Sequence, residues 1–129
     1  MKKKLFIIIV ILMLGSLLFN TSCRTIEEFF YTLNGGWWFD LEFYGGGYES
    51  IQISCTGGIA YDDTYGGMGT YSEFGSDFNI TINWFNATCG NGIDVYNGTF
   101  LDVNTISGTF SWVSDWCLPD SGTFIATRL

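Results

Sequence analysis

Hydrophobic and polar residues follow two different periods along this chain. Over residues 26–33 apolar positions recur at helical spacing, and residues 25–28 (Thr-Ile-Glu-Glu) have the spacing of a helix-capping box. Over residues 37–43 apolar positions alternate with mainly polar ones, which is the period of a strand with one buried face. The pattern therefore predicts a short N-terminal helix, ended by Asn-Gly-Gly at 34–36, and then strands.

The alternating pattern continues to the C-terminus and is interrupted by glycine-rich turns. It is clearest after the turn at Gly75, where Phe78 and Ile80 face one way while Asn79 and Thr81 face the other. We expect a bulge at Asn97-Gly98. The predicted strands cover residues 37–43, 49–56, 59–65, 69–74, 77–84, 92–103, 105–113 and 123–129.

A Gly-Thr-Phe step occurs three times in the second half of the chain. The copies begin at Gly98, Gly108 and Gly122, and Gly69-Thr70-Tyr71 is a near fourth. Their spacing is irregular, which does not fit a solenoid. We interpret the step as a turn-exit or strand-start signal, because Gly permits a bend while Thr and Phe favour the strand that follows.

Eight short strands without a crossover helix predict an all-β fold, an antiparallel up-and-down meander over residues 36–129. Closure into a barrel would remove exposed strand edges, so we favour an eight-stranded barrel over a two-sheet sandwich. The interior of such a barrel is just wide enough to be filled by side chains or to hold one small ligand.

The first 22 residues have the features of an export signal. Three lysines precede an apolar run over 5–19 that is shorter than the roughly 20 residues of a membrane span. Residues 19–23 (Phe-Asn-Thr-Ser-Cys) resemble the bacterial lipobox, although Asn20 replaces the usual Leu or Val. The resemblance implies cleavage before Cys23 and its lipidation; ordinary secretion and an uncleaved anchor are the alternatives.

These features predict three parts: a lipoprotein signal peptide (1–22), a tether with a short helix (23–35) and the barrel domain (36–129). We expect a lipid-anchored protein of the bacterial cell envelope, in the outer membrane on its periplasmic or surface face. Removal of residues 1–22 leaves two arginines against thirteen Asp and Glu, hence a net charge of −11. Such acidity argues against nucleic acid as a partner.

Catalytic chemistry has little support in this composition. The chain contains no histidine, which removes the usual general base and a common metal ligand. The acidic pairs, of which Asp62-Asp63 is one, lie in or beside predicted turns, where Asp often has a structural role. We therefore expect no enzymatic activity, no metal and no cofactor.

The cysteines constrain the arrangement of the loops. If Cys23 is acylated, three cysteines remain for pairing. A meander places the loops that carry Cys89 and Cys117 at the same end of the barrel, and Cys55 at the other. We therefore predict a Cys89 to Cys117 disulfide in an oxidising compartment, with Cys55 as a buried thiol. If Cys23 is not lipidated, the four cysteines allow three pairings.

Two residues at opposite ends of the domain suggest a family. Gly35-Gly36-Trp37 begins the first strand and Arg128 lies near the end of the last, and this layout resembles the lipocalin and avidin group of up-and-down barrels. The resemblance implies that the Trp37 indole packs against the Arg128 guanidinium at the closed end of the barrel. It also implies a small apolar or aromatic ligand in the open end.

Aromatic residues are the candidates for ligand contact. If the barrel holds a ligand, the expected contacts are Trp84, Phe110, Trp112 and Trp116. The alternative is a solidly packed barrel that acts as a tethered interaction module for an envelope protein or polymer. A cavity beneath Trp84 and Trp112 distinguishes the two hypotheses.

Overall fold

The computed structural model describes residues 31–129, which contain eight strands and no helix. The predicted signal peptide, Cys23 and all but the last residues of the predicted helix lie outside the described residues. In that part of the chain, no helix is long and apolar enough to cross a membrane. The strands are β1 (Gly35–Phe43), β2 (Tyr48–Thr56), β3 (Ile59–Asp62), β4 (Gly67–Phe74), β5 (Asp77–Asn86), β6 (Gly90–Asp102), β7 (Thr105–Ser114) and β8 (Asp120–Arg128).

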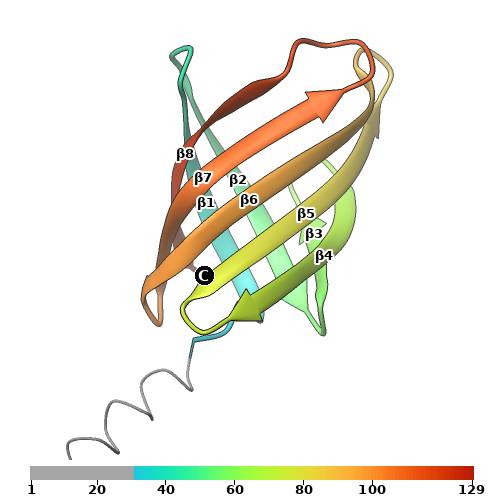
Figure 1. The fold of residues 1–129 in the computed structure, drawn as a ribbon. Helices are drawn as coiled ribbons and strands as arrows, with labels where there is room; N and C mark the ends of the chain where they lie inside the picture. Colours follow the sequence, from blue (N-terminus) through green and yellow to red (C-terminus); the bar gives the residue numbers. More distant parts are fainter. Residues whose placement is uncertain (1–30) are drawn as a thin grey trace, which may run out of the picture. The chain divides into compact units, whose positions relative to one another are not determined.

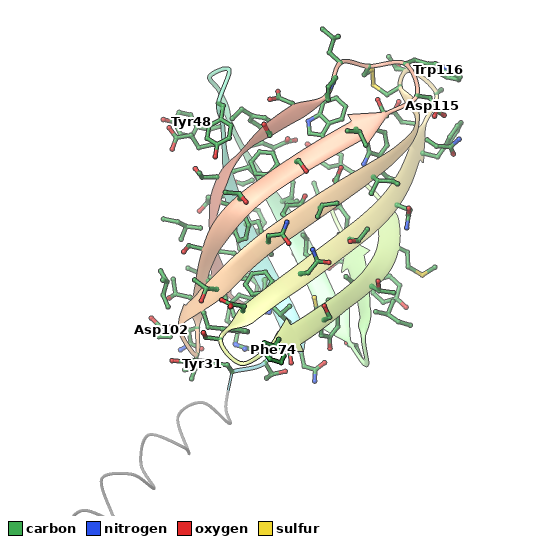
Figure 2. All side chains as sticks on the ribbon, in the orientation of Figure 1. Tyr31, Tyr48, Phe74, Asp102, Asp115 and Trp116 are labelled. Atoms are coloured by element: carbon green, nitrogen blue, oxygen red, sulfur yellow. A yellow bond between two sulfur atoms is a disulfide. The ribbon has the colours of Figure 1, made fainter. Side chains whose placement is uncertain are left out.

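The strands form a closed antiparallel barrel in sequence order, as predicted (Figure 1). Each strand pairs with the next, and β8 pairs with β1 from Trp37 opposite Arg128 to Phe43 opposite Gly122. This last pairing leaves no free sheet edge and rules out the two-sheet sandwich. Successive connections alternate between the two ends of the barrel. Figure 2 shows Tyr48 and Trp116 near one end and Tyr31, Phe74 and Asp102 near the other.

Two local predictions were wrong. The irregular register in β6 lies between Phe100 and Asp102, whereas Asn97 and Gly98 pair regularly with β7. The three Gly-Thr-Phe steps lie inside β6, β7 and β8 and do not mark turn exits. In each step the glycine and the phenylalanine are two residues apart and share the inward face.

The inward glycines make room for aromatic rings. A Cβ on Gly98 would lie 2.6 Å from Cζ of Phe78, and one on Gly122 would lie 2.8 Å from Cε1 of Phe110. Both positions also face the backbone of a neighbouring strand at close range. At Gly98 and Gly122 the repeated step therefore supplies a large ring and the space for another ring on the same face of the sheet. At Gly108 a Cβ would instead meet the backbone of β6, 2.0 Å from the oxygen of Asn97.

A continuous group of aromatic rings fills the barrel from the Trp37 end. The Trp37 ring lies 6.1 Å from the Phe100 ring, and Phe100 lies 5.6 Å from Phe78. Further along, the rings of Phe39 and Phe124 are 5.0 Å apart. Offset and edge-to-face pairs of this kind add to the free energy gained by burying the rings. Aliphatic side chains complete the core, namely Leu33, Leu41, Ile51, Ile53, Ile80, Ile82 and Ile106.

The segment preceding β1 closes this end of the barrel. Leu33 is fully buried, its carbonyl accepts a hydrogen bond from Trp37 Nε1 at 2.8 Å, and its amide donates to the Glu73 carboxylate. The Tyr31 ring stacks on Phe100 at 5.1 Å. Residues 31–34 therefore cover the Trp37 end with both apolar and polar contacts.

Arg128 joins this segment to the barrel. Its guanidinium lies 4.4 Å from the centroid of the Trp37 ring. Nη1 donates to the carbonyl of Asn34 at 2.7 Å, Nη2 to that of Thr32 at 2.5 Å, and Nε to that of Val103 at 3.1 Å. One side chain thus satisfies three carbonyls and stacks on an indole, in the contact that the resemblance implies.

We expect Arg128→Ala to lower the free energy of unfolding by about 2–3 kcal/mol, because three charge-assisted hydrogen bonds and the cation–π contact are lost. Arg128→Lys should give an intermediate loss, since an ammonium cannot reproduce the fork of donors. Urea denaturation followed by tryptophan fluorescence measures both. Thr123→Ala, on the exposed face of the same strand, is the control; equal stabilities for Arg128→Ala and the control would contradict the assignment.

Candidate functional site

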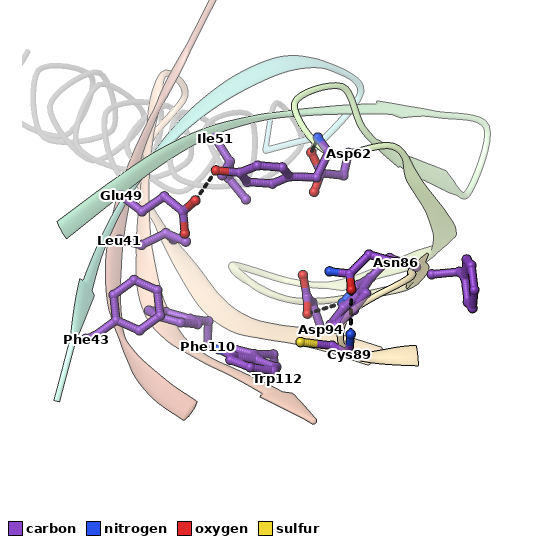
Figure 3. Close-up of a pocket in the computed structure, with 13 residues that line it drawn as sticks. Leu41, Phe43, Glu49, Ile51, Asp62, Asn86, Cys89, Asp94, Phe110 and Trp112 are labelled. Atoms are coloured by element: carbon purple, nitrogen blue, oxygen red, sulfur yellow. Dashed lines mark hydrogen bonds between the residues drawn. The ribbon is translucent and has the colours of Figure 1, made fainter. Parts of the chain in front are cut away.

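The other end of the barrel contains a cavity of about 300 Å³ (Figure 3). Apolar and aromatic side chains make up much of its lining, namely Leu41, Phe43, Ile51, Trp84, Phe110 and Trp112. The indoles of Trp84 and Trp112 are 6.0 Å apart. Glu49, Asp62 and Asp94 are also part of the lining, with Tyr65, Phe85, Asn86 and Cys89 completing it. The cavity therefore combines an aromatic surface with three carboxylates.

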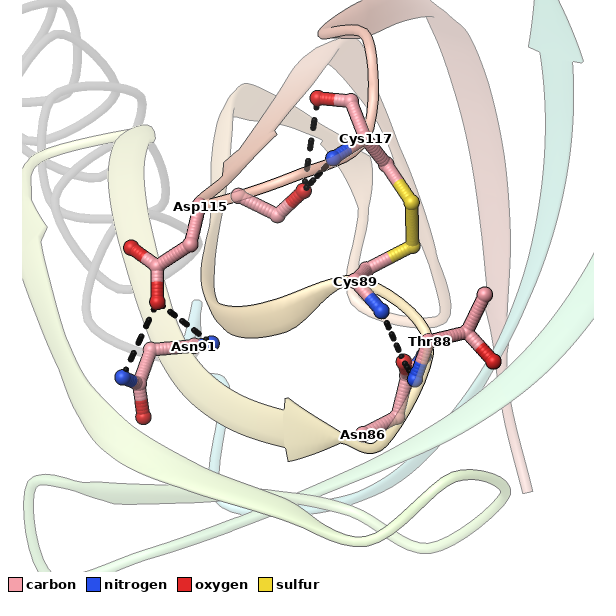
Figure 4. The surroundings of a disulfide bond; sticks show 7 residues. Asn86, Thr88, Cys89, Asn91, Asp115 and Cys117 are labelled. Carbon is pink, nitrogen blue, oxygen red and sulfur yellow. Dashed lines mark hydrogen bonds between the residues drawn. A yellow bond between two sulfur atoms is a disulfide. The ribbon is translucent and has the colours of Figure 1, made fainter.

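A disulfide between Cys89 and Cys117 fixes two loops at this end, as predicted (Figure 4). It joins the β5–β6 loop to the β7–β8 loop, and Cys89 lines the cavity. Asn86 accepts hydrogen bonds from the amides of Thr88 and Cys89, and Asp115 accepts from the amide and side chain of Asn91. These contacts hold the two loops that flank Trp84 and Trp112.

Cys55 is buried at the opposite end, where it lies next to Gly35 in the β1–β2 register. Burial, with smaller effects from the charges of Glu73 and Asp63, raises the pKa of the thiol to about 12. Its thiolate is therefore strongly disfavoured at neutral pH, and Cys55 packs as part of the hydrophobic core.

The position of Trp84 depends on a glycine in the neighbouring strand. A Cβ on Gly92 would lie 2.0 Å from Cζ2 of the Trp84 ring, so the indole lies directly on the β6 backbone. In this position Trp84 Nε1 donates a 2.6 Å hydrogen bond to Asp94, two residues along β6. Only glycine at position 92 leaves room for this arrangement.

Two further carboxylates reach the cavity from β2 and from the end of β3. Asp62 is 5 % exposed, and its Oδ1 accepts hydrogen bonds from the amides of Thr64 at 2.8 Å and Tyr65 at 2.9 Å. Within residues 31–129, no group donates to its second oxygen, Oδ2. Glu49 accepts a hydrogen bond from the Tyr65 hydroxyl. Asp62 is thus a buried carboxylate with acceptor capacity left over.

Asp94 is electrostatically coupled to the other two acids. Its pKa is raised to about 6, mainly by burial and in addition by the charges of Asp62 and Glu49, whereas the hydrogen bonds from Trp84 and Tyr96 lower it. Burial and the same three carboxylates also raise the pKa of the Tyr96 hydroxyl well above its ordinary value. Asp94, which lines the cavity, and Tyr96 therefore lie in surroundings of low polarity.

Three of the four predicted ligand contacts line the cavity: Trp84, Phe110 and Trp112. Trp116 does not line it and is 69 % exposed on the β7–β8 loop. The carboxylates of Glu49 and Asp94 were missed as site residues, and Asp62 was interpreted as a structural residue beside a turn. The alternation of inward and outward residues could have identified Glu49 and Asp94. Each lies an even number of positions from the buried residues of its strand and therefore faces inward.

Because Asp94 binds a proton more readily in the folded protein, its contribution opposes folding more strongly as pH rises from about 4 to about 6. An asparagine side chain at this position would retain an oxygen acceptor for Trp84 without the charge. We therefore compare the free energy of unfolding of Asp94→Asn with that of wild type. We expect this difference to shift in favour of the variant by about 1–2 kcal/mol as the pH rises from 4 to 7. Urea denaturation at several pH values measures this difference. Asp77→Asn, which removes an exposed charge from the opposite end, is the control; parallel pH profiles for both variants would contradict the prediction.

Comparison with known proteins gives no family to which this geometry could be assigned. No family model, curated protein or solved structure matches the chain. A function for the cavity therefore has to be inferred from its own residues.

Proposed function

We propose that this domain is a non-enzymatic barrel that binds a small ligand with an apolar or aromatic body in the cavity lined by Trp84 and Trp112. The observation that supports it is the 300 Å³ cavity with aromatic and aliphatic lining at one end of an otherwise filled barrel. Ligand sites in proteins are typically mostly apolar concavities with a few polar groups that orient the ligand. The disulfide beside the cavity holds the loops in place, so a ligand would meet a largely formed site.

We further propose that the domain is held on a bacterial envelope membrane by lipid attached to Cys23. The lipobox-like stretch over residues 19–23 supports this assignment. Acyl chains provide the membrane affinity in such proteins, at about 0.8 kcal/mol per buried methylene.

Mass spectrometry of the mature N-terminus tests the anchor. We expect the mature chain to start at Cys23 and to carry the mass of acyl groups, and Cys23→Ser should release the protein from the membrane fraction. A mature chain that begins elsewhere, or with an unmodified Cys23, would contradict the proposal.

Binding is tested with phenylnaphthylamine, a neutral aromatic probe that becomes fluorescent in apolar surroundings. We expect saturable binding, and a loss of affinity of about tenfold in Trp112→Ala, because much of the aromatic wall is removed. Trp116→Ala makes the same chemical change outside the cavity and is the matched control. Absence of saturable binding, together with no small molecule retained in native mass spectrometry, would contradict the proposal; so would equal losses in the two variants.

A second candidate is a tethered module that binds an envelope protein or polymer. It is supported by large exposed side chains around the same end of the barrel: Tyr44, Tyr48, Phe85, Trp116 and Leu118. This hypothesis assumed a solidly packed interior, and the cavity is the reason for ranking ligand binding first. A salt-sensitive pull-down from the envelope that is lost in Trp116→Ala would favour the second candidate.

A further inference from the structure

The cavity contains negative charge that no basic side chain of the domain offsets. Glu49, Asp62 and Asp94 come from three different strands, and their hydrogen-bond donors are neutral: backbone amides, Tyr65, Tyr96 and the Trp84 indole. Arg128 is the one basic residue among residues 31–129, and it lies at the opposite end of the barrel. Partly buried carboxylates without a countercharge disfavour folding. Their presence in the lining is therefore not explained by stability.

The aromatic side chains of the cavity complement the same kind of ligand as the carboxylates. Figure 3 shows Glu49 and Asp62 across the cavity from Phe110 and Trp112. The faces of indole and phenyl rings carry partial negative charge and attract cations within about 6 Å. Both surfaces therefore favour a positively charged ligand, and both disfavour an anion.

The arrangement suits an organic cation better than a metal ion. Within residues 31–129, no three acidic or sulfur-containing side chains are grouped so that they could hold a metal. The carboxylates instead surround a space of about 300 Å³. Asp62 Oδ2 accepts no hydrogen bond among residues 31–129, and no unpartnered side-chain oxygen of this part of the chain is fully buried. This oxygen is therefore an accessible acceptor for an ammonium on a residue that is only 5 % exposed.

We propose that the cavity selects an organic cation, namely an ammonium group carried on an aromatic or aliphatic body. The inference rests on the proposed ligand-binding function and adds to it the charge of the ligand. The ammonium is bound by Asp62 and Asp94, and the body of the ligand packs against Trp84, Trp112 and Phe110. The cation supplies the countercharge that the chain lacks at this end.

Three probes of the same shape and different charge test the selection by isothermal titration calorimetry: tryptamine, neutral ethylindole and anionic indolepropionate. Hexyltrimethylammonium, hexanol and hexanoate form a second set with an aliphatic body. We expect the cation in at least one set to bind about tenfold or more tightly than its neutral analogue, with no measurable binding of the anions.

The possible failures are distinguishable. Equal or tighter binding of the neutral analogues would overturn the cation inference and leave the proposed ligand-binding function intact. Failure of all six probes and of phenylnaphthylamine to bind would overturn both. Tighter binding of the anions would also overturn the inference.

Charge-neutral variants test which residues select the cation. Asp62→Asn and Asp94→Asn should each weaken cation binding by about tenfold while affinity for the neutral analogue stays the same. Asp77→Asn, which removes an exposed charge at the opposite end, should change neither affinity. Circular dichroism checks folding, and Glu49→Gln provides a third variant if Asp62→Asn does not fold. If Asp62→Asn and Asp94→Asn lose no more affinity for the cation than Asp77→Asn does, the inference is overturned.

The pH dependence of binding provides an independent readout. Asp94 faces Glu49 from β2, Asp62 from β3 and Tyr96 from β6, whereas β1 and β7 contribute apolar and aromatic side chains to the lining. Tryptamine remains protonated between pH 5 and 7.5, while Asp94 gains a proton over this range. We expect its affinity to fall by several-fold on acidification in wild type and to change less in Asp94→Asn. A pH-independent affinity in wild type would overturn the role of Asp94.

Discussion

The pairing of β1 with β8 is the constraint on which the rest of this structure depends. It joins residues 35–43 to residues 120–128, closes the barrel and leaves no free edge. It also places Arg128 opposite Trp37 in the register, so that the guanidinium stacks on the indole and holds the carbonyls of Thr32 and Asn34. Closure therefore creates both an enclosed interior and the contacts that cover one end of it.

The two ends of this interior are built differently. Near Trp37, rings and aliphatic side chains fill the space, and glycines such as Gly98 leave room for the rings of neighbouring strands. Near Trp112, the inward positions carry acids as well as rings, and the space stays open. Carboxylates resist close packing against apolar groups because they lose hydration without a partner. Their positions thus coincide with the part of the barrel that contains the cavity.

Much of the architecture could be predicted from local pattern. Alternation over residues 37–43 and the glycine turns gave the strands, and the meander order gave the Cys89 to Cys117 disulfide and the buried Cys55. The bulge and the Gly-Thr-Phe steps were misinterpreted because a strand glycine serves a turn, a bulge or a close approach equally well in sequence. The rings of Phe78 and Phe110 and the backbones of neighbouring strands, all distant in sequence, show that Gly98 and Gly122 serve close approach.

The sequence by itself determined the strand count, the antiparallel order and the candidate aromatic contacts, because period, turn residues and chain order are local properties. The tertiary structure decided where the cavity lies and that Glu49, Asp62 and Asp94 converge on it. Those acids lie on three different strands. Whether they come close together in space depends on the strand register and on how much of the interior other side chains occupy. For the same reason Trp84 and Trp112 line the cavity, while Trp116, only four residues beyond Trp112, is exposed and does not line it.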